Sequence, residues 1–447
     1  MHEKITFGYV MIGNDIYELA KALWDVPRSI TGDGVRRTLS TIKELCPELT
    51  TYEVPSGQKV FDWEVPLEWN IKDAYVEDPD GNRIVDFKQN NLHVMGYSTP
   101  IDTFVSLEEL LLHTYTQEDR VNAIPYVTSY YEPKWGFCMS EVLKRSLKRG
   151  KYRVYIDASL EPGFLTYGEI LLEGEEKEEV LISTYICHPS LGNNELSGPC
   201  LTAFLSRWLS NNVNRRYTYR IVFLPETIGS IAYLSRNVHH LKKYVIAGFN
   251  VTCVGDENAY SFLPSRLGNT YADKVAKNTL DHLVKEYRSY SYLDRGSDER
   301  QYCSPGVDLP VVSIMRSKYG EYPEYHTSDD NLEFITPKGL EGAFNAISSA
   351  IYTIENDHYP KYRVLCEPQL GKRGLYPNTG QKGKYSKAEL LTHILAYSDG
   401  KHSILDISDI LNVSFREVYE NCQTLLESDL IEYLSLLPPV QRGKKYE

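Results

Sequence analysis

A series of apolar segments, each ending in a cluster of polar residues, constrains the fold of this 447-residue chain most strongly. EVLISTYICHPS, YRIVFLPETIGS and VIAGFNVTCVGD are three of these segments, which begin at Glu179, Tyr219 and Val245. Strands rich in Val, Ile and Leu that alternate with helical stretches such as GPCLTAFLSRWLSNN are typical of a largely parallel or mixed sheet. We therefore predict an α/β fold with an active site at the carboxyl ends of its strands.

Changes along the chain in the pattern of apolar and polar residues indicate further domains. At about 100–200 residues per domain, a chain of this length predicts two to three domains. Residues 1–48 and 123–360 are expected to form the α/β domain, with helices at Asp15–Trp24, which Asp15 would cap, and at Val35–Cys46. Alternating segments such as VFDWEVP and DAYVEDPDGNRIVDF predict an inserted β-rich domain at residues 49–122.

The last part of the chain, residues 380–447, is predicted to be a winged-helix domain. Three short helical segments with the spacing of a winged helix follow a linker rich in Gly, Pro and Lys. The third segment, the nominal recognition helix, is acidic and would be repelled by phosphates. We therefore expect protein interactions, including a homo-oligomer formed through this domain or the β-rich domain, rather than DNA binding. The charged residues that decide this are Arg416, Glu417, Glu420, Glu427 and Asp429.

The composition predicts a cytoplasmic protein with neither a membrane nor a nucleic-acid partner. A net charge of −13 disfavours non-specific binding to nucleic acids. The sequence has no run of about 18 apolar residues, and its N-terminal stretch lacks the features of a signal peptide. The eight cysteines form no CxxC pair, which indicates reduced thiols in the cytoplasm.

Two histidines at the ends of apolar segments are the first candidate metal ligands. His188 follows the apolar STYIC segment and precedes Asn194, and His326 follows the loop after PVVSIMR. A histidine at a strand end, with an acid or an amide a few residues on, is how a metal site is built on a rigid sheet. A hydrogen-bonded structural role is the alternative for both histidines. For Asp329 and Asp330, a helix N-cap is the favoured interpretation.

Carboxylates at other strand ends and turns could complete the site. Glu226 ends the apolar run IVFLPE and could be a zinc ligand, a general base or the partner of a helix dipole. Asp256 ends CVGD and Asp298 lies in GSDERQY, and an ordinary turn is an equal alternative for these two. Zn²⁺ accepts histidine nitrogen and carboxylate oxygen, and it lowers the pKa of bound water to about 7.

Five ordered motifs resemble those of bacterial zinc aminopeptidase-like (M28-like) proteins, which are often linked to polysaccharide biosynthesis. The motifs are RSITGDG, CHPS followed by N-x-x-SG, PETIGS, GSDERQYCSPG and YHTSDDN. The resemblance covers nearly the whole chain, including the inserted β-rich domain and the C-terminal winged helix. It implies the zinc-peptidase fold, with a mixed sheet flanked by helices, and it implies that His188 and His326 are the two histidine ligands of zinc.

Three positions depart from the pattern of that family. Asn194 falls where the family places a metal-bridging Asp, and Thr252 falls where it places the Asp of the second metal. Glu226 is followed by Thr227, where two successive glutamates are usual. An amide lacks the charge with which a carboxylate bridges two cations, so one zinc ion is preferred and two stay possible. Asn194 and Asp256 remain candidate ligands.

These observations predict a zinc-dependent hydrolase of the aminopeptidase type that cleaves an amide bond at a free amino end. Glu226 and Asp298 are the candidate catalytic carboxylates, and Glu226 is also a candidate ligand beside His188 and His326. Asp256, Asp298 or Glu195 could fill whichever of the two roles, base or ligand, Glu226 does not. The substrate would be a small peptide or an amide on an amino sugar, and only the family resemblance implies the second. The alternative is a non-catalytic binding or scaffold protein on a peptidase fold, which Asn194 favours.

Overall fold

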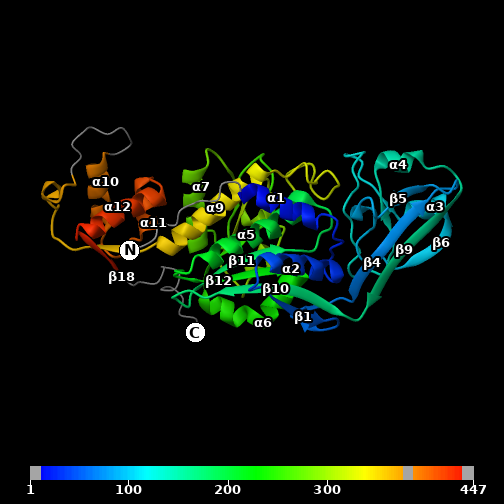
Figure 1. Ribbon diagram of the computed structural model, residues 1–447, viewed down its shortest axis with the longest axis horizontal. Helices are drawn as coiled ribbons and strands as arrows, with labels where there is room; N and C mark the ends of the chain where they lie inside the picture. The colour runs from blue at the N-terminus through cyan, green and yellow to red at the C-terminus, as the bar shows by residue number, and fades with distance from the viewer. Residues whose placement is uncertain (1–11, 376–385, 435–447) are drawn as a thin grey trace. The chain divides into compact units, whose positions relative to one another are not determined.

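The computed structural model describes residues 12–375 and 386–434 (Figure 1). The chain divides into two compact units, of which the first comprises Met1–Arg266 and Arg288–Phe344. The second unit comprises Leu267–Tyr287 and Asn345–Glu447. Among the described residues, no helix is both long enough and apolar enough to cross a bilayer.

An eight-stranded mixed sheet forms the centre of the first unit, as the alternating pattern predicted. Its four middle strands β12, β11, β13 and β16 run parallel, and β10 joins antiparallel at one side. Strands β11 and β13 are buried along their whole length, which explains why their sequences read as unbroken apolar runs. In spatial order the strands are β1 (Thr50–Pro55), β10 (Phe164–Leu172), β12 (Thr218–Leu224), β11 (Glu179–Tyr185), β13 (Val245–Asn250), β16 (Val311–Met315), β14 (Ser261–Leu263) and β15 (Arg288–Ser289).

Helices cover both faces of this sheet (Figure 1). Successive side chains of a strand point to opposite faces, so neighbouring residues of β10 identify the two layers. Gly168 lies under Leu39 of α2, whereas the ring of Tyr167 packs against Tyr233 of α6, with 5.6 Å between ring centroids. Helices α1 and α2 pack on α5 on the first of these faces. The bounds of these helices are α1 (Ile12–Leu23), α2 (Asp33–Leu45), α5 (Ser197–Asn211) and α6 (Ile228–Tyr244).

The predicted opening helices are present, with one correction. Helix α1 begins at Ile12, so Asp15 lies within its first turn instead of capping it. A carboxylate in the first turn still faces the positive end of the helix dipole, which is why an acidic residue suits this position. The second predicted helix, Val35–Cys46, corresponds to α2.

A separate four-stranded antiparallel sheet with its own apolar core follows β1 in the first unit. It differs from the segment expected at residues 49–122, because its longest strand, β9, lies beyond residue 122 and pairs with β4 and β6. Conversely, β1 lies within the expected segment but pairs with β10 of the large sheet. Alternating apolar and polar residues identify a strand but not the strands with which it pairs. The expected limits of the inserted domain therefore stay predictions. The strands in spatial order are β5 (Arg83–Asp86), β4 (Glu68–Glu77), β9 (Lys151–Glu161) and β6 (Ile101–Ser106).

Shorter elements complete the first unit. Two small sheets pair β2 with β3 and β7 with β8. The loop after β11 continues as η2, a single turn of π-helix that leads directly into α5. The bounds are β2 (Lys59–Val60), β3 (Trp63–Glu64), η1 (Asn91–His93), α3 (Leu107–Leu112), β7 (Thr114–Tyr115), β8 (Phe137–Cys138), α4 (Glu141–Ser146), η2 (Gly192–Leu196), η3 (Tyr292–Asp294) and α8 (Glu299–Tyr302).

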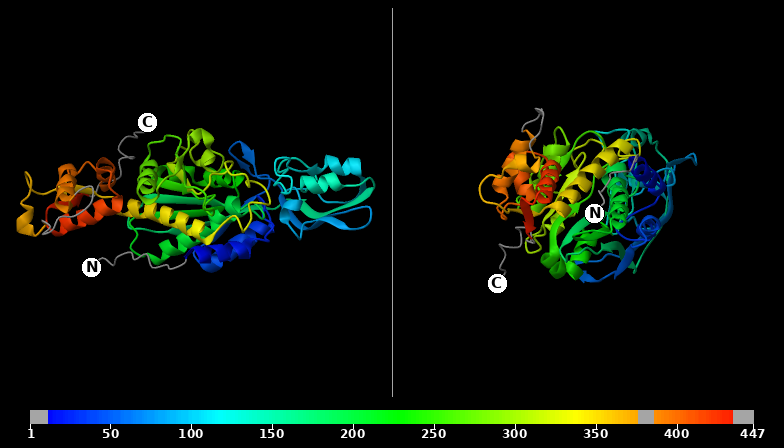
Figure 2. Two further views of the ribbon diagram at one scale, coloured as in Figure 1. Left: turned by 90° about the horizontal axis from the view of Figure 1, so that it is seen from above. Right: turned by 60° about the vertical axis from the view of Figure 1, so that its left-hand side comes forward.

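The second unit contains the three predicted helices of the winged helix, which lie side by side (Figures 1 and 2). Capping boxes begin α10 and α11, with Ser386 and Ser403 as the capping residues. Strand β18 follows α12 and pairs antiparallel with β17. Residues 380–385 and 435–447 of the predicted domain lie outside the described residues. The bounds are α7 (Tyr271–Leu283), β17 (Tyr359–Tyr362), η4 (Leu370–Arg373), α10 (Lys387–Tyr397), α11 (Ile404–Leu411), α12 (Phe415–Glu427) and β18 (Ile431–Leu434); α9 (Pro337–Asn356) enters this unit from the first.

Candidate active site

His188, Glu226 and His326 meet at the carboxyl ends of the parallel strands. His188 follows β11, Glu226 follows the neighbouring strand β12, and His326 lies on the loop after β16. The ring centroids of the two histidines lie 5.6 Å apart. The Nε2 atom of His188 is 3.8 Å from Oε2 of Glu226. The ring of Tyr126 contacts both imidazoles, with 4.9 Å between its centroid and that of His188 and 5.1 Å to that of His326. The structure thus brings together three residues that lie far apart in the sequence.

His326 presents a nitrogen without a hydrogen-bond partner. Its Nε2 atom is buried and makes no hydrogen bond within the described residues. Burial, followed by the nearby His188, lowers the pKa of His326 to about 3, so its imidazole is neutral at ordinary pH. The ring stacks on Tyr325 at 3.9 Å, and the backbone carbonyl accepts the Tyr126 N–H. A neutral, oriented imidazole with an unused nitrogen is the form in which histidine binds metals.

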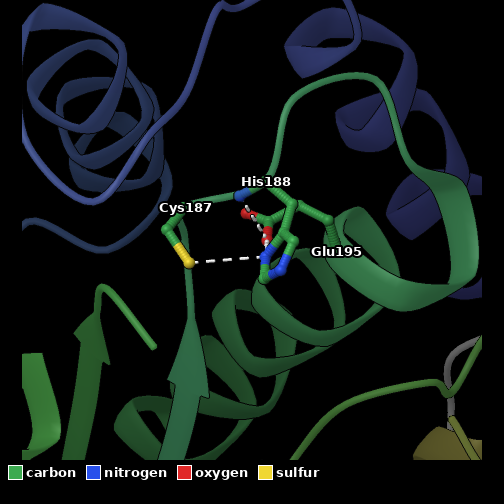
Figure 3. Close-up of side chains that lie close together, drawn as sticks. All are labelled: Cys187, His188 and Glu195. Atoms are coloured by element: carbon green, nitrogen blue, oxygen red, sulfur yellow. Dashed lines mark hydrogen bonds and ion pairs between the residues drawn. The ribbon is translucent and has the colours of Figure 1, made fainter. Parts of the chain in front are cut away.

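Glu195 holds the other nitrogen of the His188 ring (Figure 3). Its Oε2 atom accepts hydrogen bonds from the backbone N–H of His188 at 2.9 Å and from Nδ1 at 3.1 Å. Arg28, from the loop between α1 and α2, lies 3.3 Å from the other carboxylate oxygen and donates to the His188 carbonyl at 2.9 Å. The side chains of Arg28 and Glu195 are both fully buried.

Cys187, His188 and Glu195 offer ligand atoms close enough together to hold a metal, but their bonds favour a different interpretation. The thiol of Cys187 accepts the N–H of Glu226 at 3.2 Å, and burial raises its pKa well above the ordinary value. It is therefore a neutral thiol, and the negative charge of Glu195 is already balanced by Arg28. These three side chains form a hydrogen-bonded network behind His188 rather than an anionic site for a cation.

A tight turn carries Glu226. The N–H of Ile228 donates to the Glu226 carbonyl at 2.8 Å, which closes a γ-turn with Thr227 at its centre. Thr227 has φ 64° and ψ −78°, a strained conformation for a β-branched residue. Removal of the Glu226 carboxylate from water raises its pKa above the ordinary value, while His188 acts in the opposite direction. A carboxylate of raised pKa is suited to accept and return a proton.

Asp298 supports this turn, and its bonds do not reach the histidines. Its Oδ1 atom accepts the N–H of Thr227 at 2.8 Å and the hydroxyl of Ser230 at 2.7 Å, both at the start of α6. Burial, followed by the charge of Glu226, raises the pKa of Asp298 to about 8. The Oδ1 atom of Asp298 therefore supports the turn, while its Oδ2 atom is buried without a hydrogen-bond partner among the described residues. Its predicted catalytic role stays a prediction.

Asn194 and Thr252 belong to a buried polar cluster with Tyr185, in which only the amide nitrogen of Asn194 has no partner among the described residues. The Tyr185 hydroxyl donates to the Asn194 carbonyl, lies 3.0 Å from Asn194 Oδ1 and shares a hydrogen bond of 2.6 Å with Thr252. Burial raises the pKa of Tyr185 well above its ordinary value, so the phenol stays neutral. This neutral cluster occupies the two positions where the family resemblance implies anionic ligands of a second metal.

Asp256 makes four hydrogen bonds that hold loops together. It accepts the Asn193 amide at 3.0 Å, the N–H and the hydroxyl of Ser317 at 2.8 and 2.7 Å, and the N–H of Asn258 at 2.8 Å. Both carboxylate oxygens are used, so the structure gives Asp256 a role in connecting loops. Its predicted role as a metal ligand stays a prediction.

Asp330 corrects the interpretation of TSDDN as the start of the following helix. The next helix, α9, begins only at Pro337. Asp330 instead accepts the N–H groups of Asn193 and Asn194, at 2.6 and 2.9 Å, and so caps the N-terminus of η2 from a distant loop. Asp329 pairs with Arg120. A capping carboxylate was correctly expected, but the helix that it caps lies far away in the sequence.

Arg28 and Tyr126 are the site residues that the sequence did not single out for a role. Arg28 lies within the RSITGDG motif, so its presence in a shared motif was the available signal. The sequence around Tyr126 carries no comparable signal, because tyrosine is frequent throughout the chain, with 35 residues. Only the folded loop shows that its ring contacts both histidines.

Comparison with known families shows to which family the chain belongs. Residues 17–357 match the family described as a domain of unknown function, DUF4910, and residues 357–433 match a winged helix-turn-helix family. The chain belongs to the DUF4910 family. The winged helix predicted from the spacing of the last three helices is confirmed as part of this DUF4910 protein.

A protein of Clostridium acetobutylicum is 44% identical to this DUF4910 protein over 422 residues, which are 94% of this chain and 96% of the relative. Its name assigns it provisionally to polysaccharide biosynthesis and gives it an aminopeptidase-like domain. A crystal structure of a candidate peptidase from Clostridium acetobutylicum has a TM-score of 0.89 at 42% identity, covering 94% of this chain and 96% of the other. The predicted resemblance to aminopeptidase-like proteins is confirmed.

More distant solved structures share the fold. A zinc aminopeptidase from Bacillus subtilis has a TM-score of 0.54 at 12% identity, over 77% of this chain and 95% of the other. A peptidase M28 precursor from Shewanella amazonensis has a TM-score of 0.53 at 13% identity, over 77% and 93%. The DUF4910 protein therefore has the aminopeptidase-like α/β fold, with a large mixed sheet flanked by helices.

Proposed function

We propose that this DUF4910 protein is a zinc-dependent hydrolase of the aminopeptidase type, which cleaves an amide bond at a free amino end. The observation that carries the proposal is the meeting of two buried imidazoles and one carboxylate at the carboxyl edge of the parallel strands. The hydrogen bond to Glu195 directs the unbonded nitrogen of His188 toward Glu226, and the corresponding nitrogen of His326 has no partner among the described residues.

The donor set fits one zinc ion. Catalytic zinc commonly takes three protein ligands, two of them histidines with one carboxylate in several peptidases. Ligand atoms at about 2.0–2.1 Å from a tetrahedral zinc lie roughly 3.4 Å apart, and the 3.8 Å between His188 and Glu226 is close to that spacing. His188, His326 and Glu226 would hold the ion. We leave Asp256 out of this set because both of its oxygens hold loops together. We leave Asp298 out because its Oδ1 atom is bonded to the turn that carries Glu226, although its Oδ2 atom has no partner among the described residues.

A second zinc ion is disfavoured at Asn194 and Thr252. Neither side chain carries a charge, and both are bonded to the neutral Tyr185 hydroxyl. A dication bound beside these neutral side chains would have no counterion from them in a buried place, which is costly. The proposal is therefore a site with a single zinc ion, in agreement with the preference drawn from the sequence.

Residues of this chain supply substrate positioning and proton transfer. When bound, zinc supplies Lewis acidity that polarises the scissile carbonyl. If Glu226 is the base instead of the third ligand, it would take the proton of the attacking water and return it to the departing amine, a role for which its raised pKa is suited. Tyr126 and Tyr325 contact the imidazole rings and restrict their motion. Among these groups, only Glu226 has the acid–base character that the reaction requires.

The fold, the name of the Clostridium relative and the cysteines support a substrate class and a cellular location. A small peptide suits an aminopeptidase-like fold, and the name of the Clostridium relative also favours an amide on an amino sugar. None of the eight cysteines, all of which lie among the described residues, forms a disulfide, which supports work in the reducing cytoplasm.

Metal analysis of histidine variants tests the ligand set. His188→Ala and His326→Ala should each lose at least tenfold in zinc affinity and retain the far-ultraviolet circular dichroism of the parent, because only ligand atoms are removed. His93→Ala is the matched control, since His93 is also buried and its ring bonds to the Cys138 carbonyl. Zinc affinity unchanged in both site variants would overturn the assignment.

Glu226→Gln distinguishes the two roles open to Glu226. Loss of at least a hundredfold in the rate of aminoacyl anilide hydrolysis, with zinc retained, would identify a base. Loss of zinc as well as turnover would identify a ligand. A variant that retains both zinc and turnover would remove Glu226 from the proposal.

A non-catalytic scaffold is the second candidate function. Asn194 and Thr252 favour it, because a chain that no longer needs metal can replace ligands by neutral residues. The two functions differ in a simple measurement. A scaffold should show no change in melting temperature on addition of zinc, whereas a specific ligand stabilises the folded state by mass action.

A further inference from the structure

We propose that Glu195 and Arg28 are positioning residues that fix the tautomer and orientation of His188, with Nε2 left as its metal-binding atom. The inference rests on the proposed function, because it concerns the same site. It explains why the charged side chains of Arg28 and Glu195 are fully buried, which the proposed ligand set alone does not explain.

The first step is the double hydrogen bond to Glu195. One oxygen of the carboxylate accepts both the backbone N–H and the ring Nδ1 of His188, at 2.9 and 3.1 Å. A carboxylate oxygen only accepts, so Nδ1 must carry the proton. In a neutral imidazole the lone pair is then on Nε2, the atom 3.8 Å from Glu226. One side chain therefore selects the tautomer and the rotation of the ring.

The second step is the role of Arg28. Its Nε atom lies 2.9 Å from the His188 carbonyl and 3.3 Å from Oε1 of Glu195, so one guanidinium contacts both partners. A further nitrogen, Nη1, donates to the Leu23 carbonyl at 2.7 Å at the end of α1. Because a buried charge is costly without a counterion, Arg28 makes it possible for Glu195 to lie in this dry place.

The third step is the neighbouring thiol, which offers the imidazole a competing contact. Cys187 Sγ lies 3.3 Å from Nδ1 of His188 and receives the N–H of Glu226. Sulfur is a weak acceptor, so without Glu195 the ring would keep only this weak partner. It could then rotate or change tautomer, and Nε2 would no longer be presented in one direction. Partners of this kind typically change metal affinity by about 10–100-fold.

Nuclear magnetic resonance of the parent protein tests the tautomer directly. In zinc-free protein at alkaline pH, where the imidazole is neutral even beside the carboxylates of Glu195 and Glu226, a long-range ¹H–¹⁵N spectrum should show the His188 ring protonated at Nδ1 and unprotonated at Nε2, with the signal assigned by its loss in His188→Ala. This measurement needs no activity and no metal. A His188 ring protonated at Nε2 instead would overturn the inference.

Zinc affinity, measured by competition with a chromophoric chelator, tests the consequence. Glu195→Gln keeps the size of the side chain, but an amide can accept through one atom only and would point its NH₂ group at Arg28 or at His188. We expect zinc affinity to fall 10–100-fold and the His188 spectrum to show mixed tautomers. Glu179→Gln is the matched control, since Glu179 is a buried partner of Arg220 and lies at the start of β11, the strand that His188 follows.

The outcomes separate this inference from the proposed function. A parent protein that binds no zinc would contradict the hydrolase, while the tautomer could still be confirmed by its spectrum. A parent that binds zinc together with an equally tight Glu195→Gln would overturn the positioning role. If Glu195→Gln does not fold, Arg28→Lys replaces it, because lysine keeps the charge and loses the planar contact with both partners. Unchanged affinity and an unchanged spectrum in Arg28→Lys would likewise overturn the inference.

Discussion

At the scale of single residues, Thr227 shows how the chain holds a carboxylate in a fixed place. Its φ of 64° and ψ of −78° are unfavourable for a β-branched side chain, and such strain persists only where neighbours enforce it. Asp298 accepts the Thr227 N–H at 2.8 Å, and Arg300 donates to the Thr227 hydroxyl at 2.8 Å. The side chains of Asp298 and Arg300 thus hold the turn that presents Glu226.

Thr227→Gly should separate stability from activity. Glycine adopts positive φ freely, which relieves strain of about 1–3 kcal/mol, but the variant loses the hydrogen bond to Arg300 and gains freedom when unfolded. These effects offset, so the free energy of unfolding in urea should change by less than about 1 kcal/mol. The rate of amide hydrolysis should fall about tenfold, because Glu226 is held less firmly. A large loss of stability with full activity would contradict this account of the turn.

At the scale of elements, the sequence predicted what the elements are better than how they pair. Apolar runs identified β11, β12 and β13, and amphipathic spacing identified α1 and α2, since burial leaves a pattern in one segment alone. The pairing of β9 with β4, and of β1 with β10, depends on contacts between distant segments. The same limit applies to the candidate site. His188, Glu226 and His326 were each identified from their own segment, by their place after a strand, and only the fold shows that they lie together.

The supporting residues were less predictable for a physical reason. Asp330 caps η2 from a loop that follows it by more than a hundred residues, and Arg28 reaches His188 from the opening helices. Neither contact produces a periodic pattern, because each involves one side chain and a distant backbone group. Asp298 was predicted to be catalytic on its motif, and only the hydrogen bonds to Thr227 and Ser230 show what it contacts.

Asp357 connects the helices of the second unit and makes their stability depend on pH. One carboxylate oxygen accepts the N–H of Leu405 at 2.9 Å in α11, and the other accepts the hydroxyl of Tyr271 at 3.1 Å in α7. Burial raises the pKa of Asp357 from 3.8 to about 7. The folded state therefore binds the proton more tightly than the unfolded state. This contribution is fully present below about pH 4 and is lost as pH rises through about 7, by at most about 4 kcal/mol.

Asp357→Asn should remove this pH dependence. Asparagine stays neutral and keeps one acceptor for the Leu405 N–H, so the variant has no proton to release between pH 4 and 8. Melting curves of the parent and the variant at pH 5 and at pH 8 isolate the effect, because other buried carboxyls are common to both. The parent should lose more stability than the variant between the two values. An equal loss in both proteins would show that Asp357 does not titrate in this range.

At the scale of the whole molecule, charge argues against the function that a winged helix most readily suggests. The chain carries a net charge of −13. On α12, the exposed charged side chains are mainly acidic, with Glu417, Glu420 and Glu427 beside the single Arg416. Binding to DNA depends on cations that displace the counterions of the phosphates, and this helix offers almost none. We therefore predict that this domain contacts protein rather than DNA.

Charge reversal on α12 makes that argument testable. With a duplex of random sequence at about 20 mM salt, the parent protein should show no binding by fluorescence anisotropy up to about 10 μM, since repulsion from phosphates is strongest at low salt. A variant with Glu417→Lys, Glu420→Lys and Glu427→Lys should bind, and its affinity should fall steeply as salt is added. The three positions are exposed, so the substitutions should leave the fold intact. Tight, salt-dependent binding by the parent would show that another surface supplies the cations and would restore DNA as a partner.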